Sequence, residues 1–288
     1  MKKQLIPGLA LLFLFIYSCH DIETKTLDSG DAQTLLTESI TAYDIFSSTQ
    51  EESTQRGLQF EATKSAQMPA PEYPQVMVDP ADFTSWPKTI TIDYGPENVT
   101  GIDGRERRGV MIIVAQNFPN VDNSSWVVSF DEFFIDDYQV EGTQTVNYTG
   151  SNENGHPEYE CMVTEGKITP PEGKSFLFEQ HTTREWVNGF DTHFALTGNL
   201  DDLCDDDYEI TGEHSGVSSS GYSYTMTTTE PLLLNVCCKY IEDGILSVEL
   251  PDADLNCEID YRPGNDTGDL CNNQAAFNIF GNTIPIQL

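Results

Sequence analysis

Positively charged residues are scarce in this chain of 288 residues, which has 14 lysines and arginines against 47 aspartates and glutamates. Its formal net charge is −33. A nucleic-acid-binding surface needs clustered basic residues, and the only such cluster is Arg105, Arg107 and Arg108. Attraction to an anionic lipid surface by charge is disfavoured for the same reason. The composition therefore predicts no nucleic-acid partner and indicates a strongly solvated, acidic surface.

Long apolar runs are also missing. The most apolar run, 5–16, is shorter than the ~20 residues that a membrane-spanning helix needs. It follows Lys2 and Lys3 and leads into Ile16-Tyr17-Ser18-Cys19, so it has the parts of a signal peptide. An ordinary cleavage site prefers small residues at positions −3 and −1, which Ile16 and Tyr17 fit poorly. We therefore predict a lipoprotein signal peptide at 1–18, lipidation at Cys19, and an outer-membrane location at the periplasmic face or the cell surface.

Catalytic and metal-binding motifs are absent. The chain has no Gly-x-Ser-x-Gly and no His-Glu-x-x-His sequence, and no cysteine or histidine spacing typical of zinc. Five aspartates between Asp201 and Asp207 indicate either a calcium site or an acidic loop, of which we favour the loop. Paired carboxylates leave a glycoside hydrolase as a weak alternative. We predict no catalytic, cofactor or metal residues.

The chain has seven cysteines, of which six remain after Cys19. An even number of cysteines in an exported protein indicates disulfides. The six candidates all lie in the C-terminal half: Cys161, Cys204, Cys237, Cys238, Cys257 and Cys271. Because neighbouring residues of a strand point to opposite faces, Cys237 and Cys238 are expected to have different partners. We predict that these two pair with Cys257 and Cys271, and that Cys161 pairs with Cys204.

The N-terminal part reads as a tether. Residues 20–34 are polar, and apolar residues at helical spacing then predict a short amphipathic helix at 34–48. Residues 49–75 return to a Ser-, Thr-, Gln- and Pro-rich composition that favours a loop. We therefore expect 19–85 to be a lipid-anchored tether containing this one helix.

The remainder, 86–288, reads as strands. Apolar and polar residues alternate in short segments, for example Ile90, Ile92 and Tyr94, with turn residues every 8–13 positions. The last pair, 274–280 and 283–288, is joined by Gly281-Asn282, which predicts a hairpin. The expected fold is all-β and antiparallel, as a sandwich or an extended meander. The pattern also allows two similar β modules that meet near 150–158.

One motif occurs twice. Ile92-Asp93-Tyr94 and Ile259-Asp260-Tyr261 are each followed by proline two positions on and by Thr-Gly after three more residues. The repeat indicates either a duplicated site or a repeated strand–turn–strand unit, and the second interpretation is favoured because proline and glycine shape turns.

Two other groups allow a functional and a structural interpretation. Arg105, Arg107 and Arg108 could bind an anion, but arginines that balance local carboxylates explain them better in so acidic a chain. The three tryptophans could form a glycan-stacking platform, although core packing is the commoner role of so large a side chain. They are Trp86, Trp126 and Trp186.

Several segments resemble a family of β-rich Bacteroidota envelope lipoproteins of no known activity. The resemblance covers about 86–288 and is carried by 87–95, 103–105, 140–143, 183–189, 207–212 and 221–224. It implies a lipidated N-terminus, a β-rich body and an envelope location, and it offers no functional residues. The doubled Cys237-Cys238 and Cys257 depart from the family pattern. Together the observations predict a non-enzymatic, lipid-anchored envelope protein with a structural or binding role, or alternatively a glycan-binding module with exposed tryptophans.

Overall fold

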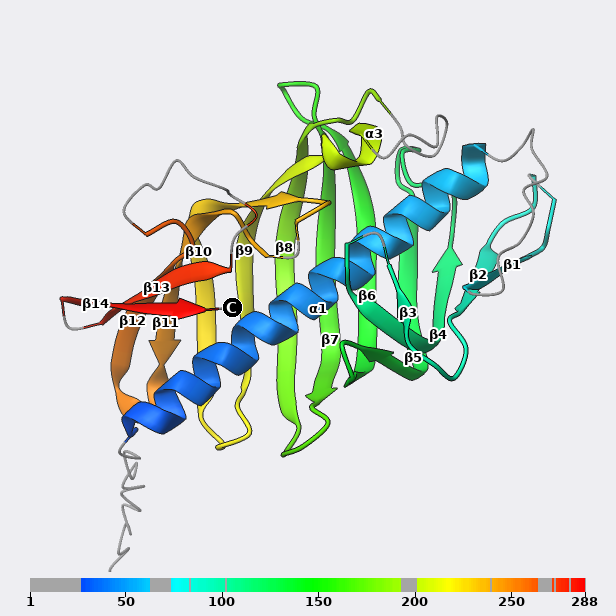
Figure 1. Ribbon diagram of the computed structural model, residues 1–288. Helices are drawn as coiled ribbons and strands as arrows, with labels where there is room; N and C mark the ends of the chain where they lie inside the picture. Colours follow the sequence, from blue (N-terminus) through cyan, green and yellow to red (C-terminus); the bar gives the residue numbers. More distant parts are fainter. Residues whose placement is uncertain are drawn as a thin grey trace, which may run out of the picture.

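The computed structural model describes residues 27–62, 74–82, 84–101, 103–192, 201–238, 240–263, 271, 273–279 and 281–287. In this part of the chain one antiparallel sheet curves around one long helix, α1 (Figure 1). The predicted signal peptide and Cys19 lie outside the described residues. No helix within those residues has an apolar stretch long enough to cross a bilayer.

The sheet is a meander in which each strand pairs with its neighbours along the chain, except that β3 pairs only with β4 beside the main path. The strands are β1 (Gln75–Asp79), β2 (Lys88–Asp93), β3 (Val99–Thr100), β4 (Glu106–Ala115), β5 (Ser125–Ile135), β6 (Tyr138–Ser151), β7 (Pro157–Thr169), β8 (Phe176–Asn188), β9 (Asp207–Val217), β10 (Ser223–Asn235), β11 (Asp243–Leu250), β12 (Leu255–Asp260), β13 (Gln274–Ile279) and β14 (Asn282–Gln287). Two short helical turns, α3 (Asp201–Cys204) and η2 (Pro251–Ala253), lie between strands.

The all-β prediction is confirmed, and the extended meander is the arrangement observed. All the strands belong to a single sheet, as in a meander. The expected sub-boundary near 150–158 falls at the hairpin between β6 and β7. These strands pair along their length, from Gln139↔Thr169 to Ser151↔Pro157, with two register shifts. The predicted hairpin at the C-terminus is present as β13 and β14.

Alternating burial places one face of the sheet against α1. In β8, for instance, buried Phe176, Phe178 and Trp186 alternate with exposed or half-buried neighbours. Successive side chains of a strand point to opposite faces, so this two-residue period directs the apolar set to the concave face. The core therefore lies between the sheet and the helix.

Helix α1 spans Ser29–Ala62 and is much longer than the predicted helix at 34–48. The expectation of a loop from residue 49 is wrong as far as Ala62. The extension is polar, and its side chains find partners on the sheet. Trp126 donates its indole N–H to Ser53 at 3.0 Å, and Gln50 donates to the sulfur of Cys161 at 2.7 Å. Polar contacts with the sheet thus replace the apolar period by which helices are recognised in sequences.

The same helix forms part of the hydrophobic core, which corrects the expectation that 19–85 is a tether throughout. Its apolar side chains are almost completely buried: Leu35, Leu36, Ile40, Tyr43, Ile45 and Phe46. Phe46 stacks on Phe178 with ring centroids 5.3 Å apart and meets Phe130 edge-on at 6.2 Å. A sheet of this size with one apolar face needs a covering layer, and α1 supplies it.

The repeated Ile-Asp-Tyr motif forms the same local structure in both copies. Asp93 accepts a hydrogen bond from the amide of Gly95 at 2.8 Å, and Asp260 accepts one from the amide of Arg262 at 2.9 Å. The amide of Tyr94 donates to the carbonyl of Gly109, and that of Tyr261 donates to the carbonyl of Gly244. Both glycines have positive φ angles. These contacts agree with the interpretation as a repeated strand–turn unit.

Candidate functional site

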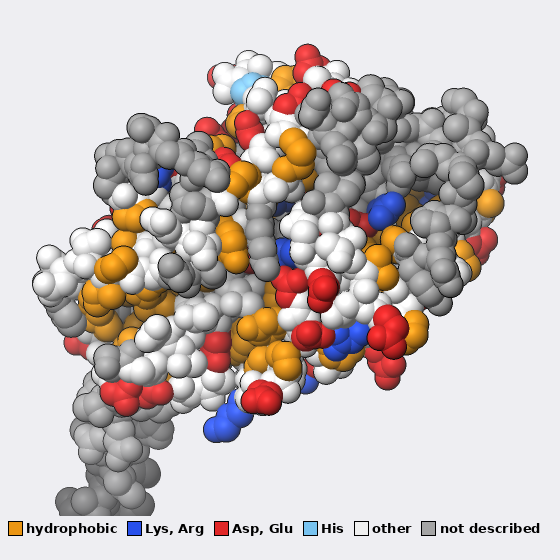
Figure 2. Space-filling view, viewed as in Figure 1, with side chains coloured by type: hydrophobic (Ala, Val, Ile, Leu, Met, Phe, Trp, Pro, Cys, Tyr) orange, Lys and Arg blue, Asp and Glu red, His pale blue; other side chains and the backbone are white. Residues whose placement is uncertain are grey.

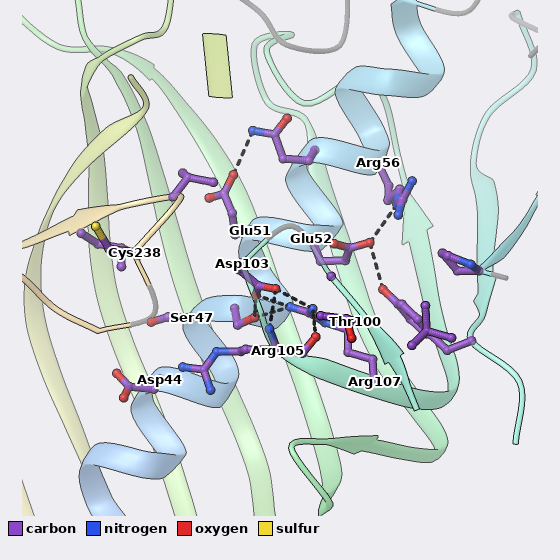
Figure 3. Close-up of a pocket in the computed structure, with 18 of the residues that line it drawn as sticks. Asp44, Ser47, Glu51, Glu52, Arg56, Thr100, Asp103, Arg105, Arg107 and Cys238 are labelled. Atoms are coloured by element: carbon purple, nitrogen blue, oxygen red, sulfur yellow. Dashed lines mark hydrogen bonds and ion pairs between the residues drawn. The ribbon is translucent and has the colours of Figure 1, made fainter. Parts of the chain in front are cut away.

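A cleft of ≈ 310 Å³ lies along the side of α1 that faces away from the core (Figure 3). Its floor comes from helical residues at three- and four-residue spacing, which share one face of a helix. The corner between β2 and β4 forms one wall, and the segment after β10 forms the other. The helical residues that line it are Asp44, Ser47, Ser48, Glu51, Glu52, Gln55 and Arg56.

The walls of the cleft supply apolar surface. Tyr94 and Val99 contribute from the corner. Leu234 contributes from the end of β10, and Val236 from the segment just after it. Pro74, which precedes β1, adds a fifth apolar residue. The cleft thus combines a charged floor with apolar walls.

Asp103 and Arg107 form a bidentate salt bridge at the corner between β2 and β4. Arg107 donates to the two carboxylate oxygens of Asp103 at 2.9 and 2.5 Å, and Ser48 of α1 donates to the same carboxylate at 2.9 Å. Burial acts to raise the pKa of Asp103, but the hydrogen bonds and charge of Arg107 outweigh it and lower that pKa. Asp103 is therefore ionised at neutral pH, and the bridge fixes the corner to the helix.

Glu52 is the centre of a second polar group. It accepts hydrogen bonds from the Tyr94 hydroxyl at 2.9 Å and from Arg56 Nε at 2.8 Å. Burial would raise the pKa of Glu52, yet the charges of Arg56 and Arg107 lower it overall. The side chains of Glu52 and Arg56 keep 20% and 24% of their surface exposed, so both charges can meet a ligand in the cleft.

Glu51, at the floor of the cleft, and nearby Asp206 are more deeply buried than Glu52. Glu51 lies 3.4 Å from Arg184, whose guanidinium lies over the Tyr208 ring, and burial raises the pKa of Glu51 despite that charge. Gln55 donates to Asp206 at 3.3 Å. Burial, followed by repulsion from Glu51, raises the pKa of Asp206 to about 9. Asp206 is therefore protonated at neutral pH.

The arginine cluster is used within the fold. Arg105 pairs with Asp136 at 3.1 Å and Arg108 pairs with Asp137, while Arg107 pairs with Asp103 as described. Each arginine thus has a carboxylate partner, in agreement with the expectation of local charge balance.

The cysteine pairing differs from the predicted one. Disulfides are present, as expected, but they join Cys204 to Cys237 and Cys238 to Cys271. Cys161 and Cys257 are buried free thiols. The predicted Cys161–Cys204 bond is wrong because β7 directs Cys161 into the core, toward Gln50 of α1. Adjacent Cys237 and Cys238 do have different partners, as their positions suggested.

The acidic segment from Asp201 to Asp207 spreads its carboxylates over several partners. Asp205 accepts a hydrogen bond from Thr192 at 3.1 Å, and Asp207 accepts one from Asn235 at 2.8 Å. Within the described residues the single group of potential metal ligands is instead Cys238, Glu242 and Cys271. Its two sulfurs form a disulfide, so they are not thiolate ligands.

The tryptophans do not form an exposed platform, which corrects the basis of the glycan-binding alternative. Trp126 and Trp186 are 2% and 1% exposed and lie in the core. Trp86 is half-buried and packs edge-on against Phe118 at 4.8 Å. These large apolar side chains therefore pack in the core or against it.

Sequence reasoning missed the cleft because most of its floor lies in the stretch assigned to a loop. The spacing of Glu52 and Arg56, four positions apart, is a helix-stabilising pair that could have indicated a helix there. Comparisons of the chain with protein-family models, curated proteins and solved structures found no match.

Proposed function

We propose that this protein is a lipid-anchored protein of the bacterial outer membrane that binds a small amphipathic ligand in the cleft beside α1. Cys19 would carry the anchor, as its sequence context predicts. The main support for the binding role is the cleft itself, which combines apolar walls with the partly exposed ion pair of Glu52 and Arg56. No catalytic step is part of this proposal.

The size and lining of the cleft support this role. Small-molecule sites are concave, measure ~300–1,000 Å³ and combine apolar walls with a few polar groups that orient the ligand. Here Val99, Leu234 and Val236 would contact an apolar body. Glu52 and Arg56 would contact its polar head group, because a cation can face the carboxylate and an anion the guanidinium.

Three six-carbon probes that differ only in head group test the binding role: hexylammonium, hexanoate and hexanol. Each is titrated into isotope-labelled protein, and amide chemical shifts are followed by NMR. We expect at least one probe to shift amides of α1 and of the β2–β4 corner in a saturable manner. The variant Thr100→Trp, which places an indole in the cleft, should weaken that binding about tenfold or more.

A matched control makes this test specific. Thr183 lies on the exposed side of β8, far from the cleft lining, so Thr183→Trp adds the same side chain elsewhere. It should leave probe affinity unchanged. If none of the probes causes saturable shifts at the cleft, or if both tryptophan variants behave alike, the cleft is not a ligand site.

The anchoring role has a separate test. Wild-type protein should sediment with membranes and extract into detergent, whereas Cys19→Ser should be recovered in the soluble fraction. Mass spectrometry of the mature N-terminus should show a diacylglyceryl group on Cys19. An unmodified cysteine, or full membrane retention of the variant, would contradict lipidation.

A further inference from the structure

The position of α1 determines how a lipidated N-terminus would orient the body. We infer that the end of the sheet at which α1 begins faces the membrane, and that the cleft is held above the bilayer and takes its ligand from the aqueous phase. This inference rests on the proposed lipidation of Cys19. It deepens the proposed function by naming the compartment from which the ligand comes.

The sheet has two distinct ends. Consecutive strands of an antiparallel meander reverse direction, so their turns alternate between the two ends. We call the end with turns 136–137, 170–175, 218–222 and 251–254 the proximal end. The opposite end, with connecting residues 116–124, 152–156, 189–192 and 201–206, is the distal end.

Contacts fix the direction of α1 relative to these ends. Near the helix start, the Glu38 carboxylate accepts hydrogen bonds from the amide of Ser219, at 2.8 Å, and from its hydroxyl, in a proximal turn. Near the helix end, Gly57 lies so close to Pro119 that an added Cβ would be 2.6 Å from the proline ring. Pro119 belongs to a distal connection, so α1 runs from the proximal to the distal end (Figure 1).

The chain between the lipid and the body is short. Leu27 already packs against the core, and it is eight residues after Cys19. Eight residues span at most about 29 Å when fully extended. Strands β7 and β8 have 13 residues each, which places the two ends of the sheet about 43 Å apart. The proximal end therefore stays within reach of the bilayer surface, while the distal end projects from it.

Charge opposes the alternative in which the body lies flat on the membrane. The formal net charge is −33, and acidic side chains are spread over the face shown in Figure 2. On the strands β7, β8 and β9, Glu158, Glu185 and Glu209 are directly opposite one another. Anionic lipid would repel such faces, which disfavours a body that lies flat on an anionic membrane.

The upright orientation sets the height of the cleft. Its helical residues, 44–56, follow Ser29 by 15 to 27 positions. At ~1.5 Å per residue they lie about 23–41 Å along the helix from its proximal start. Because α1 crosses the sheet obliquely, the height of these residues above the proximal end is smaller than their distance along the helix (Figure 1). They still lie beyond the proximal turns, so we expect the ligand to arrive in solution or on a soluble partner.

Energy transfer to the membrane surface tests the orientation. A donor fluorophore is attached to full-length lipidated protein through Ser220→Cys in a proximal turn or Glu153→Cys in a distal one, both exposed positions. The native free thiols Cys161 and Cys257 are buried, so labelling is selective. The protein is inserted in phosphatidylcholine vesicles that contain acceptor lipids. We expect transfer from position 220 to be roughly twofold or more above that from position 153.

The outcomes separate this inference from the proposed anchoring. Vesicle flotation is measured on the same samples. If the protein floats with vesicles but transfer is equal at the two positions, or larger at 153, the orientation is wrong and lipidation stands. If the wild-type protein does not float, lipidation fails and the inference fails with it.

Discussion

The hydroxyl of Tyr94 donates a hydrogen bond to Glu52 of α1 at 2.9 Å, which connects the first copy of the Ile-Asp-Tyr motif to the floor of the cleft. The equivalent Tyr261 is equally buried, but its hydroxyl has no hydrogen-bond partner among the described residues. The two copies therefore share a turn and differ in their relation to the helix. Only the first has a role at the candidate site.

Loss of the buried partner of Asp103 should destabilise the protein strongly. Arg107 is 2% exposed and donates to both Asp103 oxygens. Arg107→Met leaves the Asp103 carboxylate, whose side chain is only 20% exposed, without its cationic partner, and such a loss costs up to about 3–5 kcal/mol. We expect urea unfolding to show a loss of that size. Arg108→Met, which breaks a more exposed pair, should cost less than about 1 kcal/mol. Similar losses for the two variants would contradict the assigned role.

Deletion of α1 should prevent folding. The fragment 63–288 lacks seven large apolar side chains that α1 buries: Leu35, Leu36, Ile40, Tyr43, Ile45, Phe46 and Leu58. At ~1.5–3 kcal/mol each, their loss amounts to roughly 10–20 kcal/mol, at least as much as the whole stability of a domain. Circular dichroism and NMR dispersion should show a folded 27–288 and an unfolded or aggregated 63–288. A folded 63–288 would restore the tether interpretation.

His214 should make the protein less stable in acid. It is buried against Tyr43 and Phe178, at 5.0 and 5.6 Å between ring centroids, and burial lowers its pKa to about 3. Between about pH 6.5 and 3 the unfolded chain binds a proton that the folded chain does not, so stability falls as pH falls. His214→Phe should remove a slope of ~1.4 kcal/mol per pH unit. An unchanged slope in His214→Phe would contradict this assignment.

Asp206 should make the protein less stable as the pH rises. Its pKa of about 9 in the folded state exceeds the ~3.9 of an unfolded chain. Across that window the folded state retains a proton, so Asp206 contributes a loss of stability as pH rises. Urea midpoints from pH 5 to 9 should decline less in Asp206→Asn than in the wild type. Asp122→Asn, in an exposed loop, serves as the control, and equal declines in both variants would refute the assignment.

The disulfide pattern predicts a thiol count and a stability effect. Denatured, unreduced Cys19→Ser protein should titrate two free thiols, Cys161 and Cys257. Peptide mapping should recover Cys204–Cys237 and Cys238–Cys271. Each bond joins residues 33 positions apart, so replacing Cys204 and Cys237 with serine should cost about 3–4 kcal/mol. Recovery of a Cys161–Cys204 peptide would contradict the pattern.

The sequence predicted the strands well because alternation is a local property. Segments such as β2, with strictly alternating burial, were recognisable from side-chain type alone. Strand β10 is less obvious in the sequence because it contains Pro231, near which its register shifts. A proline suggests an interruption to sequence reasoning, whereas the sheet accommodates it at a bulge.

The cysteine pairs and the long helix could not be predicted because both depend on residues far apart in the chain. Cys204 meets Cys237 only after β9 and β10 form a hairpin. The polar half of α1 is stable because Ser53 meets Trp126, 73 positions later. Local patterns contain no information about such partners.

The sequence by itself determined the acidity and the antiparallel β class, and it favoured a strand–turn unit for the repeated motif, because these follow from side-chain type and short-range spacing. Only the tertiary structure decided that one continuous sheet encloses α1, which cysteines meet, and that a cleft lies between the helix and two distant loops. The physical reason is burial. A polar helix can be buried stably only where a curved sheet presents hydrogen-bond partners for its side chains. That curvature arises from the twist of all the strands together.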